Sequence, residues 1–244
     1  MLVGIGYYVR KRVAESLVFE RLKAAQELSR SPVVETIRDN THSLLVSAGL
    51  KVSENAWVYI LTVFIVLYAT KFLKLPRQMI LGAFLYAAMV EFITIPIFGY
   101  VSDKIGRRPL YFFGSLFTIV FAFPLFWLID SKSVAIITAT VIVALSLGHG
   151  TMFGPQAAYF PELFGARVRY TGASTGFQFA AALAGGFSPI IATAIIGYTG
   201  STIGISLYMM GLALITLVAT FFAHETVGTS EGTPTLVATS APIA

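Results

Sequence analysis

The chain has 244 residues, of which 56% are hydrophobic and 12% charged, and its mean hydropathy is +0.79. Soluble domains carry about a quarter charged residues, so this composition excludes an ordinary soluble domain and indicates a membrane protein. The absence of cysteine excludes disulfides and cysteine-ligated metals, and the net charge of +5 comes from cations beside apolar runs, which argues against a nucleic-acid partner.

The first 43 residues are predicted to hold the end of a truncated membrane span followed by a cytoplasmic helix. Residues 1–9 are apolar but too short to cross a bilayer. Residues 9–39 mix both charge signs with apolar side chains at helical spacing, as in Glu15, Phe19 and Lys23. This pattern predicts an amphipathic helix that lies on the membrane surface and ends near Pro32.

Six long apolar runs follow, and a helix that crosses a bilayer needs about 20 such residues. They are residues 44–70, 79–101, 109–129, 134–160, 171–196 and 202–223. Backbone in lipid must satisfy its own hydrogen bonds, so each run is predicted to be a helix and the fold class to be an all-α membrane protein. Because Lys51 and Glu54 lie in the first run, its lower end is expected to be partly solvated. The small, polar residues 224–244 are expected to form a disordered cytoplasmic tail.

The cations divide unequally between the two sides of these spans. The side that holds the N-terminus carries Arg10, Lys11, Arg12, Arg21, Lys23, Arg30, Arg38, Lys104, Arg107, Arg108, Arg167 and Arg169. The other side carries Lys71, Lys74, Arg77 and Lys132. Loops rich in Lys and Arg stay in the cytoplasm, so we expect a multi-pass protein of the inner cell membrane with both termini cytoplasmic.

The most informative stretch is the short charged loop at residues 99–108, GYVSDKIGRR. It fits the pattern G-x-x-x-D-[KR]-x-G-R-[RK] and resembles the signature loop of the major facilitator superfamily of secondary transporters. A second loop, YFPELFGARVR at 159–169, resembles the loop between the tenth and eleventh spans of that superfamily. SENAWVY at 53–59 and AESLVF at 14–19 resemble the seventh span and the central loop of its metabolite:proton symporter branch, which includes proline/betaine, shikimate and alpha-ketoglutarate permeases.

The family fold has twelve spans in two six-span halves, with the substrate between them. The resemblance identifies this chain as the central loop and the C-terminal half, without the N-terminal half. It implies proton symport of a small organic acid or zwitterionic solute, as half of a two-half carrier. The implied partners are the lipid bilayer, the solute, a proton, and either the missing half or a second copy of the chain. The alternative is a truncated, non-transporting membrane remnant or interaction module.

The resemblance also assigns a gate to the cytoplasmic loops. An aspartate in the position of Asp103 caps or salt-bridges a neighbouring helix end when the family's cytoplasmic gate is shut; the alternative is a solvated topological anchor. Gly99 and Gly106 are expected to allow close approach and a tight turn. The remaining gate candidates are Arg107, Arg108, Glu162, Arg167 and Arg169. Glu162 is expected to pair with the arginines of the first loop, or these charges are screened anchors.

Polar residues inside the spans are the candidates for solute binding and proton coupling. Glu91 lies near the middle of the second span, where a carboxyl group is costly; it is either functional or a neutral group that holds helices together. Lys51 and Glu54 are three residues apart and can pair on one helix face. With Asn55 and Tyr59 they form a polar stripe that either lines a solute cavity or serves as an internal structural pair.

Two further candidates lie in the fourth and fifth spans. His149 is predicted to relay protons or, alternatively, to pack through hydrogen bonds. Gln178 is a candidate hydrogen-bonding partner of the solute. The three histidines are widely separated and show no metal-ligand spacing, and the sequence has neither a phosphate-binding loop nor a nucleophile elbow. We therefore expect no metal, no cofactor and no enzyme activity.

Overall fold

The computed structural model describes Tyr8 and residues 32–165 and 168–228. Six helices in this part of the chain are long and apolar enough to cross a membrane. They are Thr41–Lys71, Arg77–Ile105, Arg107–Asp130, Val134–Glu162, Arg169–Thr199 and Ile203–Phe222. The predictions of an all-helical fold and of six spans are confirmed for the described residues.

Three of these spans contain a π-helical segment. The first consists of α4 (Thr41–Tyr59), the π-helical η1 (Ile60–Ile65) and α5 (Val66–Lys71). The fourth consists of α8 (Val134–Val143), η2 (Ala144–Gly150) and α9 (Thr151–Glu162), and the fifth of α10 (Arg169–Ala180), η3 (Ala181–Gly186) and α11 (Phe187–Thr199). The others are α6 (Arg77–Ile105), α7 (Arg107–Asp130) and α12 (Ile203–Phe222).

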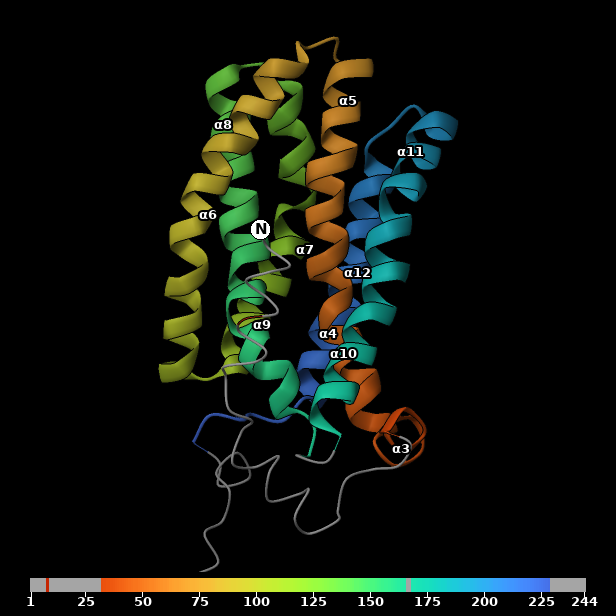
Figure 1. Cartoon of the computed structure of the whole chain (residues 1–244). Helices are drawn as coiled ribbons and strands as arrows, with labels where there is room; N and C mark the ends of the chain where they lie inside the picture. Colours follow the sequence, from red (N-terminus) through yellow and green to blue (C-terminus); the bar gives the residue numbers. More distant parts are fainter. Residues whose placement is uncertain (1–7, 9–31, 166–167, 229–244) are drawn as a thin grey trace, which may run out of the picture.

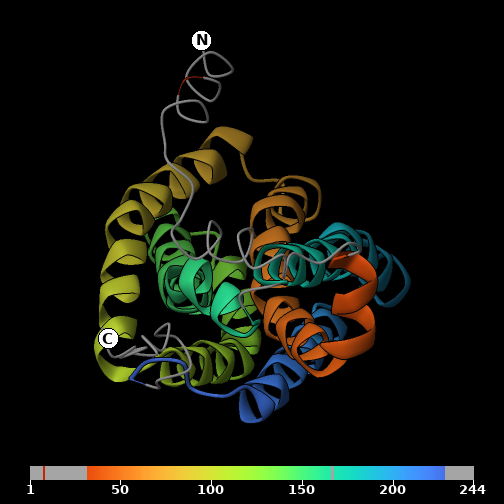
Figure 2. The same cartoon turned by 60° about the horizontal axis from the view of Figure 1, so that its bottom comes forward.

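The spans stand side by side as one bundle, with the short helix α3 (Pro32–Asp39) at its lower end (Figure 1). Helix α12 packs between α4 and α7, while α6 packs against α8 and α9. Figure 2 views the bundle from the lower end and, like Figure 1, places α6 and α11 at opposite edges, with α4 between them. This arrangement surrounds α4 with protein and leaves much of α6 uncovered.

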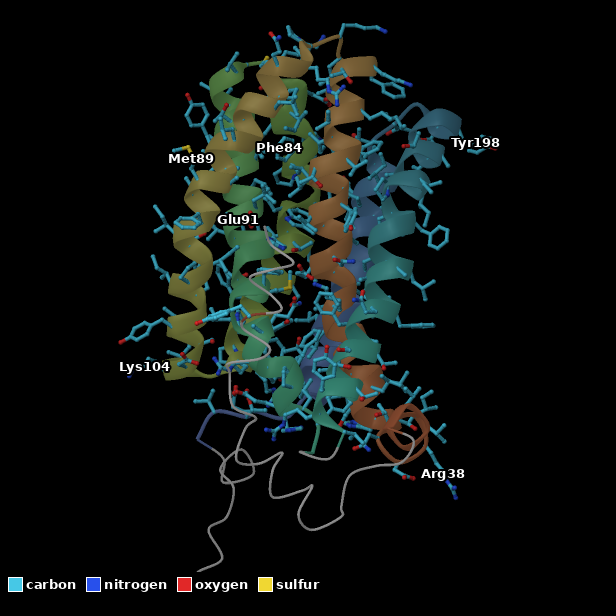
Figure 3. All side chains as sticks on the ribbon, viewed as in Figure 1. Arg38, Phe84, Met89, Glu91, Lys104 and Tyr198 are labelled. Atoms are coloured by element: carbon cyan, nitrogen blue, oxygen red, sulfur yellow. The ribbon has the colours of Figure 1, made fainter. Side chains whose placement is uncertain are left out.

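Apolar side chains cover the outside of the bundle as well as its interior. Inside, one cluster gathers around Trp57, Phe64 and Phe126. Outside, Phe92 on α6 exposes 83% of its surface and Tyr198 on α11 exposes 92%. Figure 3 shows Tyr198 pointing away from the bundle. Exposed aromatic and aliphatic surface of this extent suits lipid or another membrane helix rather than water.

The signature stretch is helical rather than a loop, which corrects the prediction. Helix α6 continues through Asp103 to Ile105, and α7 begins at Arg107, so that Gly106 alone joins them. The φ angle of Gly106 is 105°, a value that residues with a Cβ atom rarely adopt. One glycine therefore reverses the chain, and charged residues on both sides complete helical turns.

The structure describes only part of the segments predicted at the two ends of the chain. The truncated span and most of the amphipathic helix lie outside the described residues, and α3 begins at Pro32, where that helix was expected to end. The disordered tail predicted from residue 224 stays a prediction; residues 224–228 are described, and Glu225 bonds to the start of α7. Residues 229–244 lie outside the described part.

Candidate functional site

A network of polar side chains lies inside the bundle, contributed by four segments. Its members are Lys51 and Glu54 on α4, Glu91 on α6, His149 on η2 and Gln156 on α9. Lys51 and Glu54 each expose only 1% of their surface, so these two side chains are not solvated, although Leu45, nearer the lower end of the span, is 67% exposed. Both are buried because each finds ionic and hydrogen-bonding partners within the network.

His149 lies between two carboxylates. Its Nε2 is 2.9 Å from Oε1 of Glu54, and its Nδ1 is 2.5 Å from Oε1 of Glu91. A neutral imidazole donates from one nitrogen only, and an ionised carboxylate can only accept. Both contacts are therefore hydrogen bonds only when the triad holds one extra proton, either on the imidazole or on one carboxyl group. Figure 3 places Glu91 about midway along the bundle, away from its polar ends.

Lys51 contributes the amino group of the network. It forms an ion pair with Glu54 and donates to Oε1 of Gln156 at 3.0 Å. The Nζ atom also lies 4.1 Å from the ring centroid of Phe177 and 5.6 Å from that of Phe153. A buried ion is tolerated only when its partners replace water, and these contacts do so. With a protonated His149 the network holds two cations and two carboxylates, which balance.

Helices α6 and α9 pack closely against each other near the contact of Glu91 with His149. A Cβ atom on Gly154 would lie 2.8 Å from the carbonyl oxygen of Ile95 and 2.9 Å from the backbone nitrogen of Gly99. Real Cβ atoms do not approach so closely, so glycine at 154 is required for this packing. Gly99 thus belongs to a helix contact rather than to a loop.

The predicted polar stripe along α4 is divided between two neighbours. Lys51 and Glu54 contact α9 and η2, whereas Nδ2 of Asn55 donates to the carbonyl of Ala181 at 3.0 Å, on η3. Tyr59 is exposed. Gln178 is also exposed, on α10, and neither it nor Tyr59 belongs to the buried network. The four polar residues of α4 therefore have different surroundings: Lys51 and Glu54 face α9 and η2, Asn55 faces η3, and Tyr59 lies at the surface.

A second charged site lies at the lower end of the bundle, around Arg107. Its guanidinium pairs with Asp103 at 2.5 Å and with Glu162 at 3.3 Å, and it also bonds to the hydroxyl of Ser102. The structure thus brings Glu162 to an arginine of the signature stretch. Asp103 is more than half exposed, and Arg107 is its ionic partner among the described residues.

Glu225 is the residue that caps α7. Its carboxylate accepts hydrogen bonds from the backbone N–H groups of Arg107 at 2.9 Å and Arg108 at 3.0 Å. A negative charge on the free N–H groups of a helix start is stabilising. Arg108 in turn donates to the carbonyls of Thr220 at 3.1 Å and Phe221 at 3.2 Å, at the end of α12. We call Asp103, Arg107, Arg108, Glu162 and Glu225 the lower charge cluster.

Of the remaining charged gate candidates, the structure describes Arg169. Arg169, the first residue of α10, donates to the carbonyl of Phe164 at 3.3 Å, in the segment that precedes this helix. Arg167 lies outside the described residues. Sequence reasoning missed two site residues, Gln156 and Glu225. Gln156 could have been found as an amide side chain within an apolar span. Glu225 stands in the short HET motif at 224–226, which resembles the motif that follows the last span in the major facilitator superfamily.

Among the described residues, no three His, Asp or Glu side chains are grouped so that they could hold a metal ion. The network and the lower charge cluster consist of hydrogen bonds and ion pairs between side chains and backbone groups.

Comparison with known proteins places the chain in a family. The model of the Major Facilitator Superfamily matches residues 3–186. The shikimate transporter of Escherichia coli (strain K12) is 33% identical over 218 residues, which are 88% of this chain and 50% of that protein. The inner membrane metabolite transport protein YhjE of the same organism is 32% identical over 232 residues, covering 93% and 52%. The citrate-proton symporter of Klebsiella pneumoniae is 25% identical over 225 residues, covering 92% and 50%.

The chain spans about half the length of these curated relatives. No solved structure matches it significantly. The family match covers most of the chain, and the six apolar helices fit a protein that crosses the membrane several times. The chain is a multi-pass membrane protein that belongs to the Major Facilitator Superfamily.

Proposed function

We propose that the chain forms one six-helix half of a secondary carrier that moves a small organic acid or zwitterionic metabolite together with a proton. The observation that carries this proposal is His149 bridging Glu54 and Glu91 inside a membrane bundle. An ionisable cluster at this depth is costly to bury and is a functional site by default. The names of the relatives, a shikimate transporter and a citrate-proton symporter, support an acidic solute.

The exchangeable proton is best assigned to the pair of Glu91 and His149. Glu54 already has Lys51, His149 and the amide of Gln156 around it, and these donors hold it as a carboxylate. Glu91 has His149 as its ionic partner among the described residues, and 14% of its side chain is exposed. A proton can therefore enter and leave at Glu91, while Lys51 and Glu54 keep the rest of the network charged.

The solute site is proposed to lie where this half meets a second six-helix unit, as in other carriers built from two repeats. That unit is either another part of a longer protein or a second copy of this chain. Tyr59 and Gln178 are exposed and are proposed to contact the solute or that unit. The lower charge cluster is proposed to close the cytoplasmic side, with both chain ends in the cytoplasm of the inner membrane.

Uptake in membrane vesicles that contain the complete protein tests this proposal. Labelled shikimate, citrate and proline are offered with and without an inward proton gradient. We expect the gradient to drive uptake of at least one solute, and the drive to be lost in Glu91→Gln. Asp39→Asn is the matched control, because it neutralises an exposed carboxylate on α3.

Uptake that ignores the proton gradient would contradict the coupling. If no solute accumulates whether the chain is paired with a second unit or with itself, the result favours the alternative, a non-transporting membrane module.

A further inference from the structure

Two side chains of α4 each donate a hydrogen bond to a π-helical segment of a different neighbouring span, and in both cases the acceptor is the first residue of that segment. The indole Nε1 of Trp57 donates to the carbonyl of Ala144 at 2.8 Å, where η2 begins. The Nδ2 of Asn55 donates to the carbonyl of Ala181 at 3.0 Å, where η3 begins. The two donors are two residues apart, and they reach different neighbours of the same helix.

Each of these π-helical segments carries a glycine that makes room for its donor. A Cβ atom on Gly148 would lie 2.5 Å from Nε1 of Trp57, and one on Gly185 would lie 2.2 Å from Nδ2 of Asn55. Any larger residue would push the donor away from its carbonyl. The same arrangement of donor, first carbonyl and glycine therefore occurs on both sides of α4.

A π-helical turn holds one residue more than an α-helical turn, and such segments are usually maintained by a specific local interaction. If η2 changed to α-helical register, the residues that follow would rotate relative to those before it by about one residue, or roughly 100°. His149 is the sixth residue of η2. Such a rotation carries its ring away from both Glu54 and Glu91.

We propose that Trp57 is a positioning residue that holds η2 in its π-helical register and so keeps His149 between the two carboxylates. This proposal rests on the proposed function only where it gives the bridge from Glu54 through His149 to Glu91 a role in proton coupling. The claim that Trp57 sets the helical register of η2 does not depend on that function. Trp57 exposes 1% of its surface, so water does not replace its hydrogen bond when the bond is broken. A shift between the two registers is then a movement that makes and breaks the triad during transport.

Crosslinking between α6 and η2 reports the register without any transport assay. The chain has no cysteine, so Glu91→Cys and His149→Cys introduce a unique pair. This pair also removes the side-chain contact between the two positions, which leaves the register to other interactions such as that of Trp57. The crosslinked fraction is measured in membranes with a short bifunctional methanethiosulfonate reagent.

The pair is compared in three backgrounds. Trp57→Phe keeps the apolar ring and removes the donor, and Gly148→Ala displaces the donor from the other side. Trp127→Phe is the matched control, because the chain has two tryptophans and Trp127 is exposed on α7. We expect about a tenfold fall of the crosslinked fraction in the first two backgrounds, as for loss of one buried hydrogen bond, and no change in the control.

A second pair separates a change of register from unfolding. Tyr68 on α5 donates at 2.7 Å to Asp130, the last residue of α7, and neither residue belongs to η2, so cysteines at these two positions report whether the bundle is intact. Retention of this crosslink together with loss of the 91–149 crosslink supports the proposal. Equal 91–149 crosslinking in Trp57→Phe and Trp127→Phe overturns it, and so does joint loss of both crosslinks, which would make Trp57 a general support of the bundle.

Uptake measured on the otherwise unaltered protein distinguishes this claim from the proposed function. If Trp57→Phe alters the crosslink while the parent protein shows no proton-driven uptake, the register claim stands and the coupling fails. If uptake is proton-driven and the crosslink ignores Trp57, the coupling stands and the register claim fails.

Discussion

The Nδ1 atom of His149 lies 2.5 Å from Oε1 of Glu91, although 58 residues separate them in the sequence. The contact joins η2 to the edge helix α6, and the opposite ring nitrogen contacts Glu54 on α4. One imidazole thus links three spans through groups that can exchange a proton. Movement of any of these spans changes the partners of that proton.

Replacement of His149 by glutamine tests the triad. The amide keeps hydrogen-bonding atoms and a similar size but carries no exchangeable proton, so we expect proton-driven uptake to fall roughly tenfold or more. Exchange of labelled for unlabelled solute without a gradient should persist. His42→Gln is the matched control, because His42 is exposed on α4. Unchanged proton-driven uptake in His149→Gln would remove the imidazole from the coupling mechanism.

Removal of Lys51 should destabilise the fold more than removal of the whole ion pair. Lys51→Met leaves the carboxylate of Glu54 buried without its cation, which costs about 3 kcal/mol. The double change Lys51→Met with Glu54→Gln should recover most of this loss. The thermal unfolding midpoint in detergent measures both variants, and Lys71→Met, at the exposed end of α5, is the control.

The uptake of the same double variant decides between the two readings of this pair. A stable protein that no longer moves solute would place the pair in the transport site. A stable protein with normal uptake would make it an internal structural pair.

Neutralising Glu225 should weaken the lower end of the bundle. Glu225→Gln keeps an oxygen acceptor but removes the charge at the start of α7, and loss of such a cap costs about 1 kcal/mol. We expect a lower thermal midpoint than for Asp39→Asn, which neutralises an exposed carboxylate with no such role. A midpoint equal to that control would show that the cap contributes nothing to stability.

A side chain at position 106 should be harmful for two reasons. Gly106 has a φ of 105°, and its added Cβ atom would lie 2.5 Å from Oε2 of Glu225. We expect Gly106→Ala to cost about 2 kcal/mol from backbone strain alone, with a further loss where it displaces the cap. Gly211→Ala on α12 is the control, since nothing lies within 4 Å of its Cβ position. Equal unfolding midpoints for the two alanine variants would contradict the strain argument.

The positions of the six spans could be predicted from the sequence because the signal for a membrane span is local. Runs of about 20 apolar residues are visible in the sequence without any knowledge of packing, and each predicted run lies within a few residues of an observed helix. The contact between Lys51 and Glu54 was also predictable, since helical residues three apart share a face. The charges of the signature stretch predict a loop exposed to solvent. In the structure, Gly106 alone makes the turn and the residues on both sides of it are helical.

The remaining features depend on contacts between distant segments. Nothing in the local sequence pairs Glu91 with His149, or Glu225 with the start of α7. The sequence predicts one polar face from Lys51 through Asn55 to Tyr59, but residues four apart drift by about 40° per step around a helix. The π-helical segments begin at Ile60, Ala144 and Ala181, ordinary residues whose backbone register is set by their neighbours.

The cap on α7 also has a consequence for the order of biosynthesis. Glu225 follows Arg107 by 118 residues, so the ribosome has made three further spans before the cap exists. Until then the turn at Gly106 is held by other contacts, such as those of Arg107 with Asp103 and Glu162. The α6–α7 hairpin is therefore synthesised without this cap, which can form only after α12 and Glu225 have been translated.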